Sequence, residues 1–242
     1  DSEIIISFLE DEDSFIRETG VKILGIIGPS KNTDRIAKTL IEKGLDDKEW
    51  IVREATVSSL GEIIESVENK DPIIKKLISL FDDEEGWVRR ASMKILSKMK
   101  ELDASDIPFK KFKRNLKSKD PKVREACSEL IRIYGIENIG RVFDEILMLL
   151  EDPSEEVRQT MIKSMVEIIE KIGLEAVLSD LLKNLSDEGS IKLQESISLI
   201  FQKTAKYVDE NIKKRIISLL KIRCEMSQNP IICETLHQLR ES

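Results

Sequence analysis

The sequence predicts an all-α fold in which helical hairpins stack side by side into a solenoid, and three observations support this prediction. A short signature recurs along the 242 residues at a nearly constant spacing. Apolar residues around each copy follow the period of an α-helix. The composition, with 35% charged and 5% aromatic residues, is typical of amphipathic helices. Repeats of this length indicate stacked supersecondary units rather than one globular core.

The repeat signature is an apolar residue followed by Arg, a polar residue and a small residue. Seven copies follow one another at spacings of 36, 36, 35, 34, 36 and 39 residues, and their apolar residues are Ile16, Val52, Val88, Val123, Val157, Leu193 and Ile232. In the last two copies Gln194 and Cys233 replace the Arg. Apolar or small residues also recur 3, 4, 7, 8 and 11 positions after each apolar residue. These positions share one face of an α-helix, so each copy predicts the second helix of a hairpin.

A first helix is predicted upstream of each signature, most clearly over 73–81 and 142–150. The turns between first and second helices carry Asp, Asn and Pro, which are typical of helix starts. Because one hairpin cannot bury its own apolar face, we predict a single domain of seven stacked units. Their approximate ranges are 1–30, 31–69, 70–104, 105–136, 137–173, 174–207 and 208–242.

The turn segments 120–126 (DPKVREA) and 152–158 (DPSEEVR) resemble the inter-helix turn of HEAT repeats. The resemblance covers essentially the whole chain and implies a right-handed superhelix whose second helices line the concave face. It also implies a ladder of Arg and acidic side chains between repeats. On this chain the ladder would comprise Arg17, Arg53, Arg89, Arg124 and Arg158, with turn acids such as Asp13, Glu49, Glu85 and Asp120. HEAT repeats serve many functions, so the resemblance predicts a fold and leaves the function open.

Charge, cysteine content and hydropathy narrow the function classes. The formal net charge of −7 argues against a general nucleic-acid binder, which needs a basic surface. The three cysteines are odd in number and form no C-x-x-C pair, so we expect neither a disulfide framework nor a zinc site. A reducing, cytoplasmic location follows from this expectation. The longest apolar run, 146–150, is far shorter than the roughly 20 residues of a membrane span.

The inventory of reactive residues predicts a protein that is not an enzyme and binds no cofactor or metal. His237 is the one histidine, and no Gly-x-Ser-x-Gly elbow or phosphate-binding Gly-rich loop accompanies it. Acidic clusters such as 82–85 recur at equivalent turns, which indicates helix capping. HEAT-like DNA glycosylases are the enzymatic alternative, with Trp50 and Trp87 available to stack on an exposed base.

We expect a non-enzymatic scaffold that binds another protein on its second-helix face, within a larger complex. The position five residues after the apolar signature residue is apolar in several units, which predicts a groove lined by Val57, Met93 and Ile162. Arg53, Arg89 and Arg90 would flank this groove. Alternatively, the same apolar residues fill gaps between neighbouring units.

An aromatic edge precedes the signature in the first three units. Phe15, Trp50 and Trp87 stand where the following units carry Lys or Glu. Aromatic residues at a helix start are candidates for a partner-binding patch. The alternative is that their rings fold over the adjacent turn as part of the core.

One basic segment, 110–124, offers a different function. Its cations include Lys110, Lys111, Lys113, Arg114 and Lys117. Phe109 and Phe112 share one helix face and are expected in the core, which leaves the cations in solvent. The alternative to a scaffold is therefore a module that binds nucleic acid or anionic lipid through this segment.

Overall fold

The computed structural model describes residues 2–28, 32–186 and 190–241, and its regular elements are all helices. The predicted all-α fold class of stacked helical hairpins is confirmed. The chain forms two compact units, Asp1–Ala126 and Cys127–Ser242. No helix in the described ranges has the length and hydropathy needed to cross a lipid bilayer.

The first unit consists of three helical hairpins and the start of a fourth. In each hairpin a first helix leads through a turn into a longer second helix. The hairpins are α1 (Ser2–Phe8) with α2 (Ser14–Ile27); α3 (Thr33–Thr39) and η1 (Leu40–Gly44) with α4 (Trp50–Ile63) and η2 (Ile64–Ser66); and α5 (Asp71–Ser79) and η3 (Leu80–Asp82) with α6 (Gly86–Lys98). The fourth begins with η4 (Ala104–Asp106), α7 (Phe109–Asn115) and the first residues of α8 (Pro121–Asn138).

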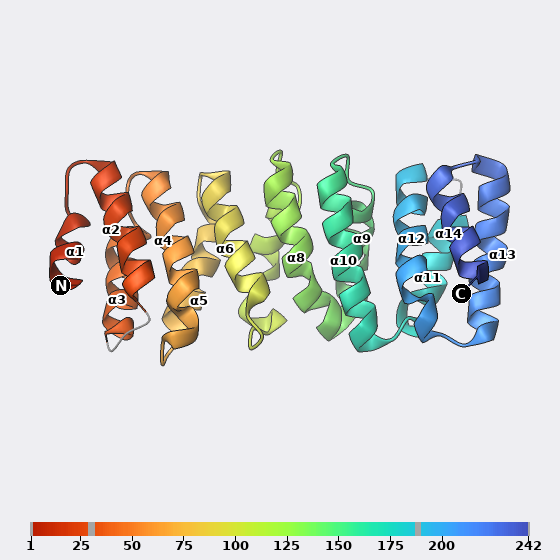
Figure 1. Cartoon of the computed structure of the whole chain (residues 1–242), viewed down its shortest axis with the longest axis horizontal. Helices are drawn as coiled ribbons and strands as arrows, with labels where there is room; N and C mark the ends of the chain where they lie inside the picture. The colour runs from red at the N-terminus through yellow and green to blue at the C-terminus, as the bar shows by residue number, and fades with distance from the viewer. Residues whose placement is uncertain (1, 29–31, 187–189, 242) are drawn as a thin grey trace. The chain divides into compact units, whose positions relative to one another are not determined.

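The second helices α2, α4 and α6 pack side by side as one layer of this unit (Figure 1). Small residues permit the close approach of α2 and α4. A Cβ added at Gly25 would lie 3.0 Å from the Cα of Ser59. The Ser59 hydroxyl donates to the backbone oxygen of Val21 across the same contact, at 3.1 Å. The turns into α2, α4 and α6 lie along the upper edge in Figure 1.

The second unit repeats the hairpin construction. It contains the remainder of α8 and η5 (Ile139–Arg141); α9 (Phe143–Leu150) with α10 (Glu155–Ile172); α11 (Glu175–Ser186) with α12 (Ile191–Thr204) and η6 (Ala205–Tyr207); and α13 (Glu210–Ser227) with α14 (Pro230–Glu241). Its second helices α10, α12 and α14 pack in succession. The helix face predicted from the signature is the buried one in both units, as Val52, Val88, Val157 and Ile232 show.

A disulfide joins Cys224 in α13 to Cys233 in α14, with an S–S distance of 2.02 Å. The expectation that the chain contains no disulfide was therefore wrong. The two helices are separated only by Gln228 and Asn229, so the hairpin brings together two cysteines that are nine residues apart. Cys127 is buried and lies outside this bond.

The predicted apolar groove is also wrong, because its residues are not exposed. Val57 and Met93 are fully buried and Ile162 is 2% exposed. A residue five positions after the apolar signature residue lies about 140° around the helix from it, on the flank that faces the next second helix. The side chains therefore fill the contacts between neighbouring hairpins, as the alternative interpretation had it.

Candidate functional site

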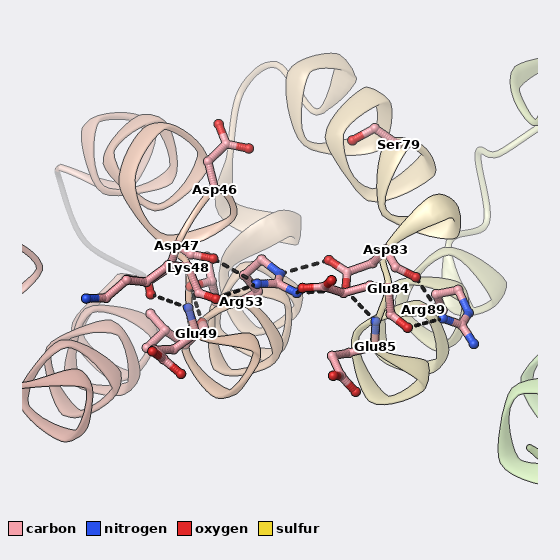
Figure 2. A network of polar contacts seen from close by, with 12 residues as sticks. Asp46, Asp47, Lys48, Glu49, Arg53, Ser79, Asp83, Glu84, Glu85 and Arg89 are labelled. Carbon is pink, nitrogen blue, oxygen red and sulfur yellow. Dashed lines mark hydrogen bonds and ion pairs between the residues drawn. The ribbon is translucent and has the colours of Figure 1, made fainter.

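The turn into each second helix is held by the Arg of the repeat signature. The Arg53 Nη1 atom donates to the backbone oxygens of Asp47 and Lys48, at 2.9 and 3.2 Å. Its Nε and Nη2 atoms donate to the two carboxylate oxygens of Asp83 in the following turn, at 2.8 and 2.9 Å (Figure 2). We call such a pair, between an Arg and the Asp of the next turn, a rung.

Arg17 forms the preceding rung in the same way. Its Nη1 atom donates to the backbone oxygens of Asp11 and Glu12, both at 3.0 Å. Its Nε and Nη2 atoms donate to Asp47 at 2.7 and 2.8 Å. Both rungs exclude most solvent, since the four side chains are between 6% and 9% exposed. Two parallel charge-assisted hydrogen bonds are the strongest form of this contact.

The electrostatics of the rungs follow from this geometry. The hydrogen bonds from Arg53 to Asp83 raise the pKa of Arg53 against the opposing effect of burial. Burial alone would raise the pKa of Asp47, but the hydrogen bonds from Arg17 and from the Glu49 amide outweigh it. The pKa of Asp47 is consequently lowered, and the carboxylate stays ionised.

The acids predicted for the ladder need correction. The rungs use Asp47 and Asp83, two residues before the predicted Glu49 and Glu85, which contribute only backbone amides to these carboxylates. Asp13 and Asp120 accept from the amides of Phe15 and Lys122 instead, and so cap α2 and α8. The Arg fork points away from the start of its own helix. The acids that accept from it therefore lie earlier in the following turn than the predicted acids do.

Arg89, Arg124 and Arg158 hold their own turns through contacts with the backbone, which differ from the predicted ladder between repeats. The Nη1 atom of each donates to the backbone oxygen six residues earlier, at 2.7 Å in all three. Figure 2 shows Arg89 bonded to backbone oxygens of its own turn.

The aromatic edge is exposed. Phe15 is 71%, Trp50 38% and Trp87 50% exposed, so these rings are not part of the core. The Arg90 guanidinium lies 5.5 Å from the centre of the Trp87 ring, within cation–π range. Their role in partner binding remains a prediction.

The basic segment surrounds α7. Phe112 is buried and Phe109 half-buried, whereas Lys110, Lys113, Arg114 and Lys117 are exposed. Lys111 and Arg114 form ion pairs with Asp82, and the Lys111 pair is 3.0 Å long. A shallow pocket of about 520 Å³ is lined by Asp82, Lys110, Lys111, Lys113, Arg114 and Lys117.

The positive charge extends beyond α7. Residues 86–124 carry thirteen Lys and Arg but only four Asp and Glu, a formal charge of +9 in a chain of net charge −7. The net charge of the whole sequence conceals the positive charge of this segment. A sum of formal charges in a sliding window would have revealed it.

The described residues contain no candidate metal site, because no three His, Cys, Asp or Glu side chains lie close enough together to hold an ion. His237 is exposed and lies 3.4 Å from Glu241 in the next helical turn. The exposed cations around α7, together with the exposed Trp87 ring, make up the candidate site.

Two family models match the sequence. Residues 59–148 match the family described as DNA alkylation repair enzyme, and residues 39–67 match the HEAT repeat. The segment of charge +9 lies entirely within the first match. No curated protein matches the sequence.

Solved structures resemble the chain in fold. YibA of Escherichia coli has a TM-score of 0.65 at 22% identity, over 100% of this chain and 81% of that chain. The CpcE–CpcF complex of phycocyanin lyase from Nostoc sp. PCC7120 gives 0.56 at 16% identity, over 100% and 94%. Importin beta gives 0.65 at 17% identity, over 98% of this chain and 36% of that chain. Identities this low show a shared helical-repeat fold and nothing further.

The match over 59–148 contradicts two predictions made from the sequence. A non-enzymatic protein-binding scaffold was predicted, whereas the matching family is one of repair enzymes. The prediction that the protein is not an enzyme fails for the same reason. The exclusion rested on an inventory of hydrolase-type motifs, and the absence of such motifs does not exclude other enzyme chemistry.

Replacing one rung acid should destabilise the first unit. We expect Asp47→Asn to lower the free energy of unfolding by about 3–5 kcal/mol, because Arg17 then loses its buried counter-ion. Asp46→Asn is the matched control in the same turn. The Asp46 side chain is 66% exposed and pairs only with Lys76, so its loss should cost at most about 1 kcal/mol. Urea unfolding followed by circular dichroism measures both, and equal costs would contradict the assignment.

The same rung predicts a pH dependence. Since the pKa of Asp47 is lowered in the folded state, its contribution is fully present above the unfolded value of about 3.9. It is lost as the pH falls through the lower, folded value. The stability difference between the wild type and Asp47→Asn should therefore be constant from pH 5 to 8 and shrink below about pH 4. A difference that instead shrinks between pH 6 and 8 would exclude Asp47 as its source.

Because the aromatic edge is exposed, we predict that its rings contribute little to the free energy of unfolding. Trp87→Ala should change the free energy of unfolding by at most about 1 kcal/mol, the size of an exposed cation–π contact. Leu96→Ala, at a fully buried position of the same helix, should cost about 2–5 kcal/mol. Chemical denaturation measures the free energy of unfolding of both variants. A loss for Trp87→Ala as large as that for Leu96→Ala would show that the Trp87 ring is part of the core.

Proposed function

We propose that the chain binds DNA and acts on alkylated bases. The observation that carries this proposal is the overlap of two segments of the sequence. The segment of charge +9, residues 86–124, lies inside the stretch that matches DNA alkylation repair enzymes. The match covers 59–148, so the proposal applies first to this part of the chain.

The basic side chains supply affinity for the phosphate backbone. Lys110, Lys117 and Lys119 are exposed and form no ion pair within the described ranges. Lys and Arg side chains bind DNA by neutralising phosphates and releasing counter-ions, which makes the affinity strongly dependent on salt. The net negative charge of the whole chain does not oppose this contact, because a Debye length of about 8 Å confines the effect of distant acids.

The exposed rings suit an alkylated base. Alkylation of a purine ring nitrogen leaves the base with a positive charge and weakens its glycosidic bond. Aromatic faces attract cations and stack on bases, so Trp50 and Trp87 would favour such a base over an unmodified one. Unstacking is less costly for a damaged base, which adds to this selectivity.

The salt dependence of DNA binding tests the proposal. We expect the protein to bind duplex DNA containing N7-methylguanine, with an affinity that falls steeply between about 50 and 200 mM salt. The variant Lys110→Ala/Lys117→Ala/Lys119→Ala should lower the slope of log affinity against log salt by up to about 2.7, or about 0.9 per phosphate contact. Fluorescence anisotropy of labelled duplex measures this slope.

A matched control separates the segment from positive charge in general. Lys163, Lys171 and Lys203 are exposed lysines of the second unit, and their triple replacement by Ala should leave the slope unchanged. Release of methylated base from the same duplex, followed by chromatography, tests the catalytic part. Binding without release would overturn the repair activity, and absence of salt-dependent binding would overturn the proposal as a whole.

A further inference from the structure

Five turns of the chain share one construction, which makes their residues directly comparable. In each, a backbone oxygen accepts from the Nη1 atom of the signature Arg six residues later. A side-chain oxygen of the same residue accepts from the backbone amide two residues later. The residues in this position are Asp11, Asp47, Asp83, Ser118 and Asp152. Ser118 is the exception that carries no carboxylate.

This exception leaves one Arg without its rung. Asp47 binds the fork of Arg17, and Asp83 binds the fork of Arg53. The turn that follows Arg89 offers Ser118 instead. Among the residues that the structure describes, the hydrogen bonds of the Arg89 side chain come from its Nη1 atom, and none comes from Nε or Nη2.

Arg89 nevertheless keeps the two backbone contacts that orient the other two Arg side chains. Its Nη1 atom donates to the backbone oxygens of Asp83 and Glu84, at 2.7 and 2.9 Å. The fork is therefore oriented before any ligand binds, which reduces the entropy lost on binding. A half-buried guanidinium with two free, parallel donors matches the geometry of a carboxylate or a phosphate.

The charge of the turn favours an anion that comes from outside it. The rung-forming turns are acidic, with formal charges of −2 over 46–49 and −4 over 82–85. The equivalent residues 117–120 (KSKD) sum to +1. Lys117 and Lys119 are exposed on either side of Ser118. An external anion at this turn therefore lies beside two exposed lysines, whereas the rung-forming turns would repel it.

Asp120 is an acid at this place that opposes an anion. Its Oδ2 atom would lie 3.0 Å from a Cβ at Gly86, and the Arg89 Nη2 atom would lie 3.6 Å from the same point. The described structure shows no ion pair between Asp120 and Arg89, and the Asp120 Oδ1 atom accepts from the Lys122 amide at 2.8 Å and caps α8. Asp120 should weaken anion binding without filling the fork.

We propose that the fork of Arg89, with the Ser118 hydroxyl, is a seat for one phosphate group, and that its ligand is a phosphodiester of the DNA backbone. The identity of the ligand rests on the proposed function, whereas the seat itself rests on the missing rung. In effect, the phosphate occupies the place that an Asp carboxylate takes in the two preceding turns.

The sharpest test is a substitution that supplies the missing rung acid from the chain itself. Ser118→Asp restores the residue found in the other four turns, so it should pair with Arg89 and exclude phosphate. Ser118→Asn is the matched control of the same shape without charge. We expect Ser118→Asp to raise the melting temperature by about 2–4 °C relative to Ser118→Asn. Arg89→Gln removes the fork directly and should also remove phosphate binding.

The first arm uses inorganic phosphate alone. In nuclear magnetic resonance spectra of the whole chain, the Arg89 Nε–H signal should shift saturably with phosphate in the wild type and in Ser118→Asn. It should not shift in Ser118→Asp, and it should shift at lower phosphate in Asp120→Asn. A signal that ignores phosphate in the wild type, or that still responds to it in Ser118→Asp, would overturn the seat.

The second arm uses duplex DNA. Ser118→Asp should bind about tenfold more weakly than Ser118→Asn, and its salt slope should be smaller by about 0.9. Equal DNA binding by the two variants would overturn the assignment of a DNA phosphate to Arg89, while the lysine triple variant still reports on the proposed function. An Arg89 response to phosphate in a protein with no DNA affinity would support the seat for free phosphate and overturn the DNA function.

Discussion

The rest of the first unit depends on the grip that each signature Arg has on its own turn. The backbone oxygens in the turn between two helices have no partner within either helix. The Nη1 atoms of Arg17, Arg53 and Arg89 each satisfy two such oxygens at the point where the first helix ends and the second begins. The direction of the second helix is thereby fixed, and so is the direction of the remaining Arg fork. Stacking of one hairpin on the next follows from that direction.

The hairpins could be predicted from the sequence because their signal is local. Apolar spacing and turn residues act within a dozen positions, and both are repeated seven times along the chain. The rung acids could not be chosen in this way. Asp47 and Glu49 are both acidic and two residues apart, and only the turn geometry decides that the side chain of one and the amide of the other take part. The disulfide depends likewise on the length of one turn, which the spacing of the cysteines does not reveal.

The candidate site was only partly predictable, for two physical reasons. Residues on the flank of a second helix look available on a helical wheel, but a layer of parallel neighbours covers both flanks, and so Val57 and Met93 are buried. Charge acts over a Debye length, whereas the net charge of the sequence sums over the whole chain. The exposed cations around α7 and the exposed Trp87 ring were visible in the sequence. Their significance for binding depended on the formal charge summed over the local segment.

The same Arg serves two purposes, and one residue in the following turn selects between them. With Asp in that turn, the fork is neutralised and buried, and its free energy goes into holding two hairpins together. With Ser118 there, this stabilisation is given up, but an oriented cation remains at the surface of a turn that is itself positively charged. Loss of the acid and gain of Lys117 and Lys119 act in the same direction, since each favours an external anion over an internal one. A repeat protein can thus acquire a binding site at one position without changing the backbone that all its turns share.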